Sequence, residues 1–340
     1  MKVLVTGHGG YIGAVLAPFL ARAGHEVTGL DTMFYDGCDL YEPEQVETVR
    51  GDIRDVRPAD LEPFDAVVHL AALSNDPLGD LDRELTLAIN FHATVDLARA
   101  AKEAGVGRFV FASSCSMYGA AADRAPVDES APLKPLTAYA ESKVRAEEAL
   151  TALADSGFAP VSMRNATAYG ASPRLRLDIV LNNLVGWALT TGKVRILSDG
   201  TPWRPLVHVE DIARATLAAL EAPADVVRGE AFNVGSDADN HRVRDLAEIA
   251  SKAVGGSEIE YAGSGDPDPR SYRVDFTKLN RAFPALELIW AAPAGAEELA
   301  GAYRRSGLTL DEFDGPRYTR LKRLRALAED GALDSDLRWR

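Results

Sequence analysis

The sequence predicts an α/β protein with a doubly wound parallel sheet and a smaller, mostly helical C-terminal lobe. Three observations support this fold class. Short apolar strands alternate with amphipathic helices through the first half of the chain, as in parallel sheets whose strands are joined by helical crossovers. Gly7, Gly10 and Gly13 stand where the first strand turns into the first helix. After residue 165 the alternation ends and most segments are helical.

The first half of the chain contains the segments that are expected to form the sheet. Apolar runs predict strands at residues 2–6, 26–30, 46–50, 65–70, 108–112 and 161–164. Amphipathic periodicity predicts helices at residues 11–23, 84–104 and 139–154. Gly24 and Gly105 follow the first two helices, as C-terminal glycines do, and Thr137 is placed to cap the third. The order of these segments predicts parallel pairing.

The second half of the chain follows a different order. We expect helices at residues 180–191, 210–220 and 243–254, strands at 194–197 and 231–234, a Gly/Pro/Asp loop at 263–270, and a mostly helical remainder. Residues 1–165 are expected to form a dinucleotide-binding domain to which 205–235 contributes, and 166–340 mainly a substrate-binding lobe. Since no low-complexity linker separates the two parts, the cleft between them is the expected ligand site.

Composition and charge argue against several classes of protein. The net charge of −14 argues against non-specific nucleic-acid binding, which needs a basic face. No run reaches the roughly 18 apolar residues of a membrane span, and the first residues lack the pattern of a leader peptide. Cys38 and Cys115 form neither a metal-binding spacing nor a disulfide framework, which fits a reducing compartment. We therefore expect a cytoplasmic protein with no nucleic-acid or membrane partner.

One basic stretch interrupts this acidic chain. Residues 317–325 read Arg-Tyr-Thr-Arg-Leu-Lys-Arg-Leu-Arg. We interpret the stretch as a solvated helix face, and a ligand or partner site is the alternative. The sequence indicates no role for the segment 310–340 that contains it.

A glycine-rich turn predicts a dinucleotide site. Residues 6–13 read Thr-Gly-His-Gly-Gly-Tyr-Ile-Gly, directly after the first apolar strand. Such a turn lets the backbone approach the pyrophosphate of a dinucleotide, and the following helix offers its free N–H groups to the phosphates. Asp31 ends the next strand, where a carboxylate accepts hydrogen bonds from the adenosine ribose and repels a 2′-phosphate. The sequence therefore predicts NAD rather than NADP.

The ends of two further strands are expected to contact the cofactor. Asp52 and Ile53 follow the third strand and are expected to flank the adenine. Residues 70–72 (Leu-Ala-Ala) end the fourth strand, where small side chains let the backbone approach the cofactor. We interpret the neighbouring His69 as a packed, hydrogen-bonded imidazole rather than as a catalytic group.

A tyrosine and a lysine are spaced as a catalytic pair. Tyr139 and Lys143 lie four residues apart in a predicted helix, so they share one face. A nearby ammonium lowers the pKa of a phenol from its reference of about 10, which makes the tyrosine a usable general base. Upstream, residues 113–116 (Ser-Ser-Cys-Ser) end a strand, where a hydroxyl can bond the substrate oxygen that Tyr139 deprotonates. The alternative for the pair is an ordinary surface helix.

With these motifs the chain resembles the extended short-chain dehydrogenase/reductase family, and within it the NAD-dependent nucleotide-sugar epimerases and dehydratases. The resemblance spans nearly the whole chain. It rests on residues 6–13, Asp31, 51–54, 69–72, Asn90, 113–119, Tyr139, Lys143 and 203–211. It implies a Rossmann domain followed by a smaller lobe for the nucleotide sugar. It also implies that Tyr139 is the base, that Lys143 lowers its pKa and holds the nicotinamide ribose, and that Ser114 aligns the substrate hydroxyl.

The resemblance also implies the partners of the protein. NAD is the expected cofactor and a nucleotide-diphosphate sugar the expected ligand. The helices at 84–104 and 139–154 are expected to pair in a homodimer, and Asn90 is expected to be structural. The expected cofactor contacts are Gly7, Gly10, Tyr11, Ile12, Gly13, Asp31, Asp52, Ile53, Leu70, Ala71, Ala72, Ser113, Tyr139 and Lys143.

Eight residues are candidates for contacting the substrate. They are Ser74, Cys115, Ser116, Thr167, Arg174, Arg176, Arg204 and Arg270. Arg204 and Arg270 stand where the family places diphosphate-binding arginines, whose forks suit phosphates; exposed salt bridges are the alternative. For Cys115 the alternative is a small side chain that fills space. Many members carry an asparagine three residues after the arginine that matches Arg164. This chain has Thr167 there and its asparagine at Asn165, so the sugar pocket is expected to differ from that of the common galactose epimerases.

The expected reaction follows from the residues beside Ser114. The family's 4,6-dehydratases carry an Asp-Glu pair directly after the matching residue, whereas this chain has Cys115 and Ser116. Neither side chain readily protonates a leaving hydroxyl. The sequence therefore predicts a nucleotide-sugar 4-epimerase that transiently oxidises C4 of an NDP-hexose. A 4-ketoreductase, a 4,6-dehydratase and a non-catalytic NAD-binding sensor or scaffold are the alternatives, and the nucleotide base and the sugar stay open.

Overall fold

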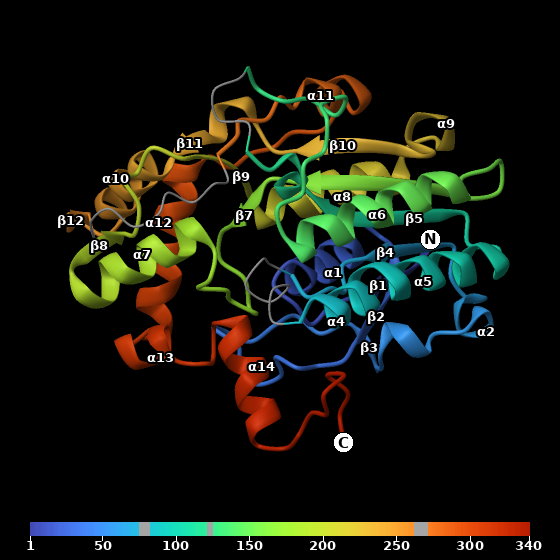
Figure 1. Ribbon diagram of the computed structural model, residues 1–340, viewed down its shortest axis with the longest axis horizontal. Helices are drawn as coiled ribbons and strands as arrows, with labels where there is room; N and C mark the ends of the chain where they lie inside the picture. The colour runs from blue at the N-terminus through green and yellow to red at the C-terminus, as the bar shows by residue number, and fades with distance from the viewer. Residues whose placement is uncertain (75–81, 121–124, 262–270) are drawn as a thin grey trace.

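A seven-stranded sheet forms the centre of the computed structural model, which describes residues 1–74, 82–120, 125–261 and 271–340 (Figure 1). The strands are β1 (Lys2–Thr6), β2 (Glu26–Asp31), β3 (Glu47–Arg50), β4 (Ala66–His69), β5 (Arg108–Ser114), β6 (Ala159–Asn165) and β10 (Glu230–Val234). Their order is β10-β6-β5-β4-β1-β2-β3, and all pairings are parallel. The predicted doubly wound sheet is therefore confirmed, and its order reverses between β1 and β4.

Helices cover both faces of this sheet. They are α1 (Gly13–Arg22), α2 (Pro58–Leu61), α4 (Arg83–Leu87), α5 (Ala93–Glu103), α6 (Ala138–Leu153), α8 (Val209–Glu221), α9 (Ala224–Val227) and α11 (Thr277–Ala282). Val3 and Val5 of β1 belong to the same buried cluster as Leu16 of α1, whereas Leu4 shares a cluster with Leu97 of α5. This division arises because successive side chains of a strand point to opposite faces.

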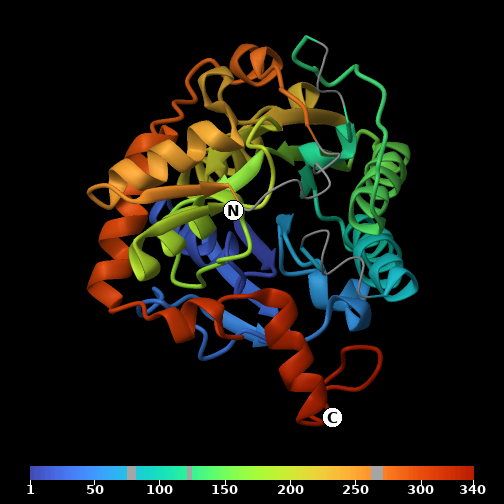
Figure 2. The same ribbon diagram turned by 60° about the vertical axis from the view of Figure 1, so that its left-hand side comes forward.

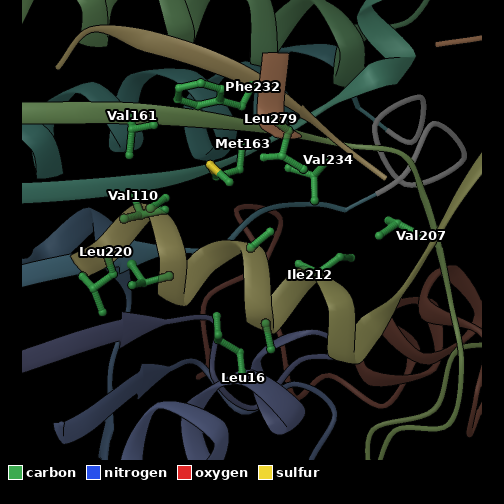
Figure 3. Close-up of a cluster of buried hydrophobic side chains, with 14 of the residues drawn as sticks. Leu16, Val110, Val161, Met163, Val207, Ile212, Leu220, Phe232, Val234 and Leu279 are labelled. Carbon is green, nitrogen blue, oxygen red and sulfur yellow. The ribbon is translucent and has the colours of Figure 1, made fainter. Parts of the chain in front are cut away.

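The larger of these two cores holds the first helix against the sheet. Figure 3 shows Ile212 and Leu220 of α8 between Val110 of β5 and Leu16 of α1. All four side chains are buried. The packing fixes α1, and with it the glycine turn at its N-terminus, relative to the strand ends.

The helix that the sequence predicts at residues 84–104 is present, but it is not α-helical throughout. A π-helical turn, Ala88–His92, separates α4 from α5. Asn90 in this turn accepts a hydrogen bond from the Leu73 amide at 2.8 Å and donates one to the Leu73 carbonyl at 3.0 Å. The Asn90 amide therefore holds the chain that leaves β4, which is a structural role.

The second half of the chain packs around a core of its own. It contains β7 (Thr167–Tyr169), β8 (Lys193–Ile196), β9 (Trp203–His208), β11 (Asn240–Arg242), β12 (Glu258–Tyr261), α7 (Val180–Thr191), α10 (Val243–Ala253), α12 (Ala292–Ser306) and α13 (Leu310–Asp314). Its strands pair as β11-β9-β7 and β12-β8. The sequence analysis missed β7, β9, β11 and β12, because such short strands show little periodicity. The loop expected at 263–270 lies outside the described residues.

The C-terminal segment returns to the loops of the central sheet. The helix α14 (Arg320–Glu329) and the residues after it lie beside the chain that follows β2 (Figure 1, Figure 2). Nε of Arg323 donates to the Phe34 carbonyl at 3.2 Å, and Nε1 of Trp339 donates to the Thr32 carbonyl at 2.6 Å. The end of the chain is thus anchored next to the predicted cofactor site. Within the described ranges, the helices are too short or too polar to cross a membrane.

Candidate active site

A cavity of about 700 Å³ lies at the carboxyl ends of β1, β2, β4 and β5, the edge of a doubly wound sheet where ligands bind. All of the predicted cofactor contacts line it: Gly7, Gly10, Tyr11, Ile12, Gly13, Asp31, Asp52, Ile53, Leu70, Ala71, Ala72, Ser113, Tyr139 and Lys143. The predicted catalytic or substrate residues that line it are Ser74, Ser114, Ser116, Thr167, Arg176 and Arg204. The fold therefore gathers residues from both halves of the chain around one space.

The glycines of the turn let the backbone pack closely beside the cavity. Gly7 has a positive φ of 76°, and a Cβ atom there would lie 2.6 Å from the amide nitrogen of Ala71. A Cβ atom on Gly13 would lie 2.3 Å from the Gly7 carbonyl oxygen. At the start of α1 the Ala14 amide donates to the Gly10 carbonyl at 3.0 Å and the Val15 amide to the Ile12 carbonyl at 3.1 Å. The amides of residues 11–13, which precede them at the cavity, suit phosphate oxygens, so the turn fits the predicted NAD.

Asp31 connects the glycine turn to the loop after β2. Its Oδ2 accepts a hydrogen bond from the Gly9 amide at 3.0 Å, and its Oδ1 accepts one from the Met33 amide at 2.6 Å. A carboxylate has about four acceptor positions, so two remain for the hydroxyls of a ribose. Asp52, at the end of β3, pairs instead with Arg54 at 2.6 Å.

Tyr139 and Lys143 lie on α6 against the end of β5. Nζ of Lys143 donates to the Ala112 carbonyl at 2.7 Å and lies 5.7 Å from the centroid of the Tyr139 ring. The lysine is 3% exposed, and burial lowers its pKa to about 7. Thr137 caps the N-terminus of α6, as the sequence predicts: its hydroxyl accepts a hydrogen bond from the Ala140 amide. A basic group therefore stands within electrostatic reach of a phenol in the cavity wall.

Ser114 ends β5 in the same cavity wall. Its Oγ accepts a hydrogen bond from the Ser116 amide at 3.2 Å and donates one to the Ser116 hydroxyl at 2.9 Å. It caps the 3₁₀ helix Cys115–Tyr118. Two mutually bonded hydroxyls therefore stand at the cavity, and their remaining donor and acceptor positions can bond a substrate hydroxyl.

His69 is a structural residue, as the sequence interpretation holds. Its Nδ1 lies 2.7 Å from the Thr6 hydroxyl and its Nε2 lies 2.8 Å from the Thr94 hydroxyl. Burial and, to a smaller extent, the charge of Lys143 lower its pKa to about 3. The ring is neutral and hydrogen-bonded on both sides, so it does not supply a proton to the cavity.

The structure places Cys115 away from the cavity, which corrects its prediction as a substrate contact. The thiol is fully buried in the core on the α8 side of the sheet. Its Sγ donates to the Arg164 carbonyl at 3.0 Å, and burial raises its pKa. The 3₁₀ helix that begins at Cys115 turns this side chain into the core, where it fills space.

Arg174 is also placed away from the cavity wall. Its guanidinium pairs with Asp36 at 3.3 Å and with Asp39 at 3.0 Å, and it donates to the Tyr35 carbonyl. These contacts hold the loop that follows β2. Arg176, in contrast, lines the cavity. Arg270, the remaining candidate, lies outside the described residues.

The cavity wall includes residues that the sequence analysis did not propose. Among them are Tyr35, Asp178, Arg195, Tyr272 and Arg320. The interpretation of residues 317–325 as a solvated face is wrong for Arg320, which is 2% exposed. Arg320, Leu324 and Leu327 are all buried, and their i, i+4, i+7 spacing is the signal that could have shown that one arginine faces inward.

Comparisons with known proteins show the family to which the chain is similar. A family model described as "NAD dependent epimerase/dehydratase family" matches residues 3–235. A UDP-glucose 4-epimerase of Corynebacterium glutamicum is 32% identical over 285 residues, which cover 78% of this chain and 85% of that protein. A dTDP-glucose 4,6-dehydratase of Streptomyces griseus is 30% identical over 309 residues, which cover 84% of this chain and 90% of that protein.

Solved structures show the same fold. MoeE5 in complex with UDP-glucuronic acid and NAD superimposes with a TM-score of 0.78 at 28% identity, covering 90% of this chain and 100% of MoeE5. DesIV, a dTDP-glucose 4,6-dehydratase of Streptomyces venezuelae with NAD bound, gives a TM-score of 0.78 at 25% identity, covering 92% of this chain and all of DesIV. Both similarities extend over the two halves that enclose the cavity.

Proposed function

The chain belongs to the NAD dependent epimerase/dehydratase family, and we propose that within it the protein is a nucleotide-sugar 4-epimerase. It would invert C4 of an NDP-hexose by transient oxidation. The family and its relatives are NAD-dependent enzymes, and the glycine turn and Asp31 fit that cofactor. Ser114, Tyr139 and Lys143, which line one cavity with it, are the proposed catalytic residues.

The proposal rests on the carboxylates of the cavity wall, each of which already has a partner. Among the described residues of this wall, the carboxylates are those of Asp31, Asp52 and Asp178. Each is engaged by backbone N–H groups or by an arginine. The position beside Ser114 is held by the buried Cys115 instead of an acid. Elimination of water across C5–C6 needs an acid and a base besides the tyrosine, so the wall supports reversible oxidation at C4.

The proposed mechanism assigns one task to each of the three residues. NAD, when bound, would supply the nicotinamide ring as acceptor and donor of the C4 hydride. Tyr139 takes the proton of the C4 hydroxyl through its phenolate oxygen and later gives it back. The ammonium of Lys143, held by the Ala112 carbonyl at 2.7 Å, stabilises the negative phenolate. The Ser114 hydroxyl bonds the C4 oxygen and keeps it in line with Tyr139.

Inversion requires that the 4-keto sugar present its other face before the hydride returns to C4. Thr167 and Arg204 line the part of the cavity that the second half of the chain supplies. We propose that Arg204 holds the diphosphate of the nucleotide sugar, since an arginine fork matches phosphate oxygens. A diphosphate held in this way lets the sugar turn while the nucleotide stays bound.

A 4,6-dehydratase is the second candidate, because one of the similar proteins carries that name. The same three residues would also serve a 4-ketoreductase, which uses them once per turnover. The three activities differ in their products: an epimer, a 4-keto-6-deoxy sugar, or a reduced sugar with consumption of NADH.

The test is proton NMR of UDP-glucose, UDP-galactose, UDP-glucuronic acid and dTDP-glucose, each incubated with the purified chain without added NADH. We expect interconversion at C4 of at least one sugar. Tyr139→Phe is the matched control, because it removes only the hydroxyl. A product that absorbs in alkali, as 4-keto-6-deoxy sugars do, or turnover that depends on stoichiometric NADH would contradict the proposal.

We also propose that the chain forms a homodimer through α4, α5 and α6. These helices lie side by side on one face of the molecule (Figure 1), and the Arg145 guanidinium lies 4.3 Å from the Phe91 ring centroid across them. Sedimentation of the protein should give twice the mass of one chain. Arg145→Glu should shift it toward one chain, and a monomeric unaltered protein would refute the proposal.

A further inference from the structure

Two buried arginines in the cavity wall have no part in the mechanism above. Arg176 follows β7 and is 7% exposed, and Arg320 begins α14 and is 2% exposed. Both line the cavity. Nη2 of Arg176 and Nη1 of Arg320 have no hydrogen-bond partner among the residues that the structure describes. Buried polar groups are ordinarily paired, so these two nitrogens call for an explanation.

The other contacts of the two arginines fix their positions. Nε of Arg176 donates to Asp178 at 2.8 Å, and its Nη1 donates to the Ser74 hydroxyl at 3.2 Å. Nη2 of Arg320 donates to the Arg174 carbonyl at 2.9 Å, and its Cζ lies 3.9 Å from the centroid of the Tyr35 ring. One arginine is therefore tied to the loop after β4, and the other to the loop after β2.

The positive charges of Arg176 and Arg320 are not fully balanced by carboxylates. Asp178 pairs with Arg176, and the nearby Asp36 and Asp39 pair with Arg174. The Asp178 carboxylate, already paired with Arg176, also acts on the second guanidinium group, that of Arg320. Burial lowers the pKa of Arg320, and so does the charge of Arg176. An uncompensated buried cation is costly unless an anion joins it, so the pair is suited to an anionic ligand.

The sheet order indicates which anionic group of a ligand would lie beside the two arginines. In the sheet, β1 lies between β4 and β2. Ser74 follows β4, Tyr35 follows β2, and the glycine turn follows β1, so the two arginines stand at loops on either side of that turn. The turn is the place that offers N–H groups to a dinucleotide diphosphate. Arg204, the arginine proposed for the substrate, comes from β9 in the other half of the chain.

We propose that Arg176 and Arg320 bind the diphosphate of the bound NAD, so that the first residue of α14 and the C-terminal segment form part of the cofactor site. The contacts of Arg323 with the Phe34 carbonyl and of Trp339 with the Thr32 carbonyl hold this segment over the loop that follows Asp31. The basic stretch at 317–325 thus supplies one inward arginine for an anion. The inference rests on the cofactor and is independent of the reaction at C4.

The test compares ligand affinities of the full chain after removal of its cofactor, by calorimetric titration with NAD, ADP-ribose and UDP. Arg320→Gln removes the charge but keeps a donor for the Arg174 carbonyl. It should weaken NAD and ADP-ribose about tenfold or more, because both contain the cofactor diphosphate. UDP, which carries the diphosphate of the substrate, should bind as it does to the unaltered chain. Arg325→Gln, at an exposed position of the same helix, is the matched control and should change nothing.

Two results would overturn the proposal. If UDP weakens as much as NAD, the arginine serves the substrate diphosphate. If NAD affinity stays within about twofold of the control, the arginine is structural. Should Arg320→Gln fail to fold, Arg320→Lys decides the same question, since it keeps the charge but loses the fork that grips two oxygens. Failure of the epimerase test would leave these NAD affinities unchanged, so the two proposals fail separately.

Discussion

The cavity has two walls that are built in different ways. The wall formed by residues 1–165 consists of strand ends, which parallel pairing brings to one edge of the sheet, and of the first turns of α6. The wall formed by the second half depends on contacts between distant segments, such as that of Arg320 with Arg174, 146 residues apart. The first wall carries the glycine turn, Asp31 and Tyr139, which the chemistry needs. The difference suggests that the first wall sets the reaction and the second sets which ligands are held, and how tightly.

The largest effect is expected from a change in the first wall. Tyr139→Phe removes the proton acceptor but neither the ring nor the charge of Lys143. Turnover should fall by about 100-fold or more, while NAD content stays the same. Initial rates by NMR and the NAD released on denaturation measure the two quantities. Unchanged turnover would show that the base lies elsewhere.

The next effect tests the charge of Lys143. Its pKa is lowered to about 7 by burial, and ribose hydroxyls and phosphates favour its charged form, so NAD binding should raise that pKa. The chain should then take up a proton on binding NAD one pH unit above this value and very little one unit below it. NAD affinity should fall as the pH rises through this range.

Calorimetry in two buffers of different ionisation enthalpy measures the proton uptake. Lys143→Met should abolish the uptake, because methionine keeps the length of the side chain without its charge. Proton release on binding NAD, or uptake that persists in this variant, would contradict the assignment.

A smaller and different effect is expected from the second wall. Arg204→Gln should raise the KM for the nucleotide sugar about tenfold, which is about 1.4 kcal/mol, with kcat and NAD affinity little changed. Steady-state kinetics with NAD-loaded enzyme measures this. If kcat falls instead, Arg204 acts on the reacting carbon and the division between the walls is wrong.

The smallest catalytic effect is expected from Cys115. Because its thiol packs in the core and not at the cavity, Cys115→Ala should lower the free energy of unfolding by about 1 kcal/mol and leave kcat and KM unchanged. Chemical denaturation and steady-state kinetics provide the two values. A changed KM with unchanged stability would show that Cys115 contacts the substrate after all.

The same contrast explains how much of the site could be predicted. Strand ends and the spacing of Tyr139 and Lys143 are local features, so the first wall follows from the sequence. The direction of Cys115 depends on a 3₁₀ turn that begins at that residue, and the π-helical turn at Asn90 leaves no periodic signal. The inward position of Arg320 depends on where α14 docks, which is decided by contacts with residues far away in the chain.

The central claim is that the hydride removed from C4 returns to the same carbon within one cycle. It is tested most directly with a UDP-hexose deuterated at C4, incubated with the protein in ordinary water without added NADH. We predict that the C4 epimer forms and keeps its full deuterium content, as mass spectrometry and NMR would show. Loss of deuterium from the epimer, or a product that is not inverted at C4, would contradict the account.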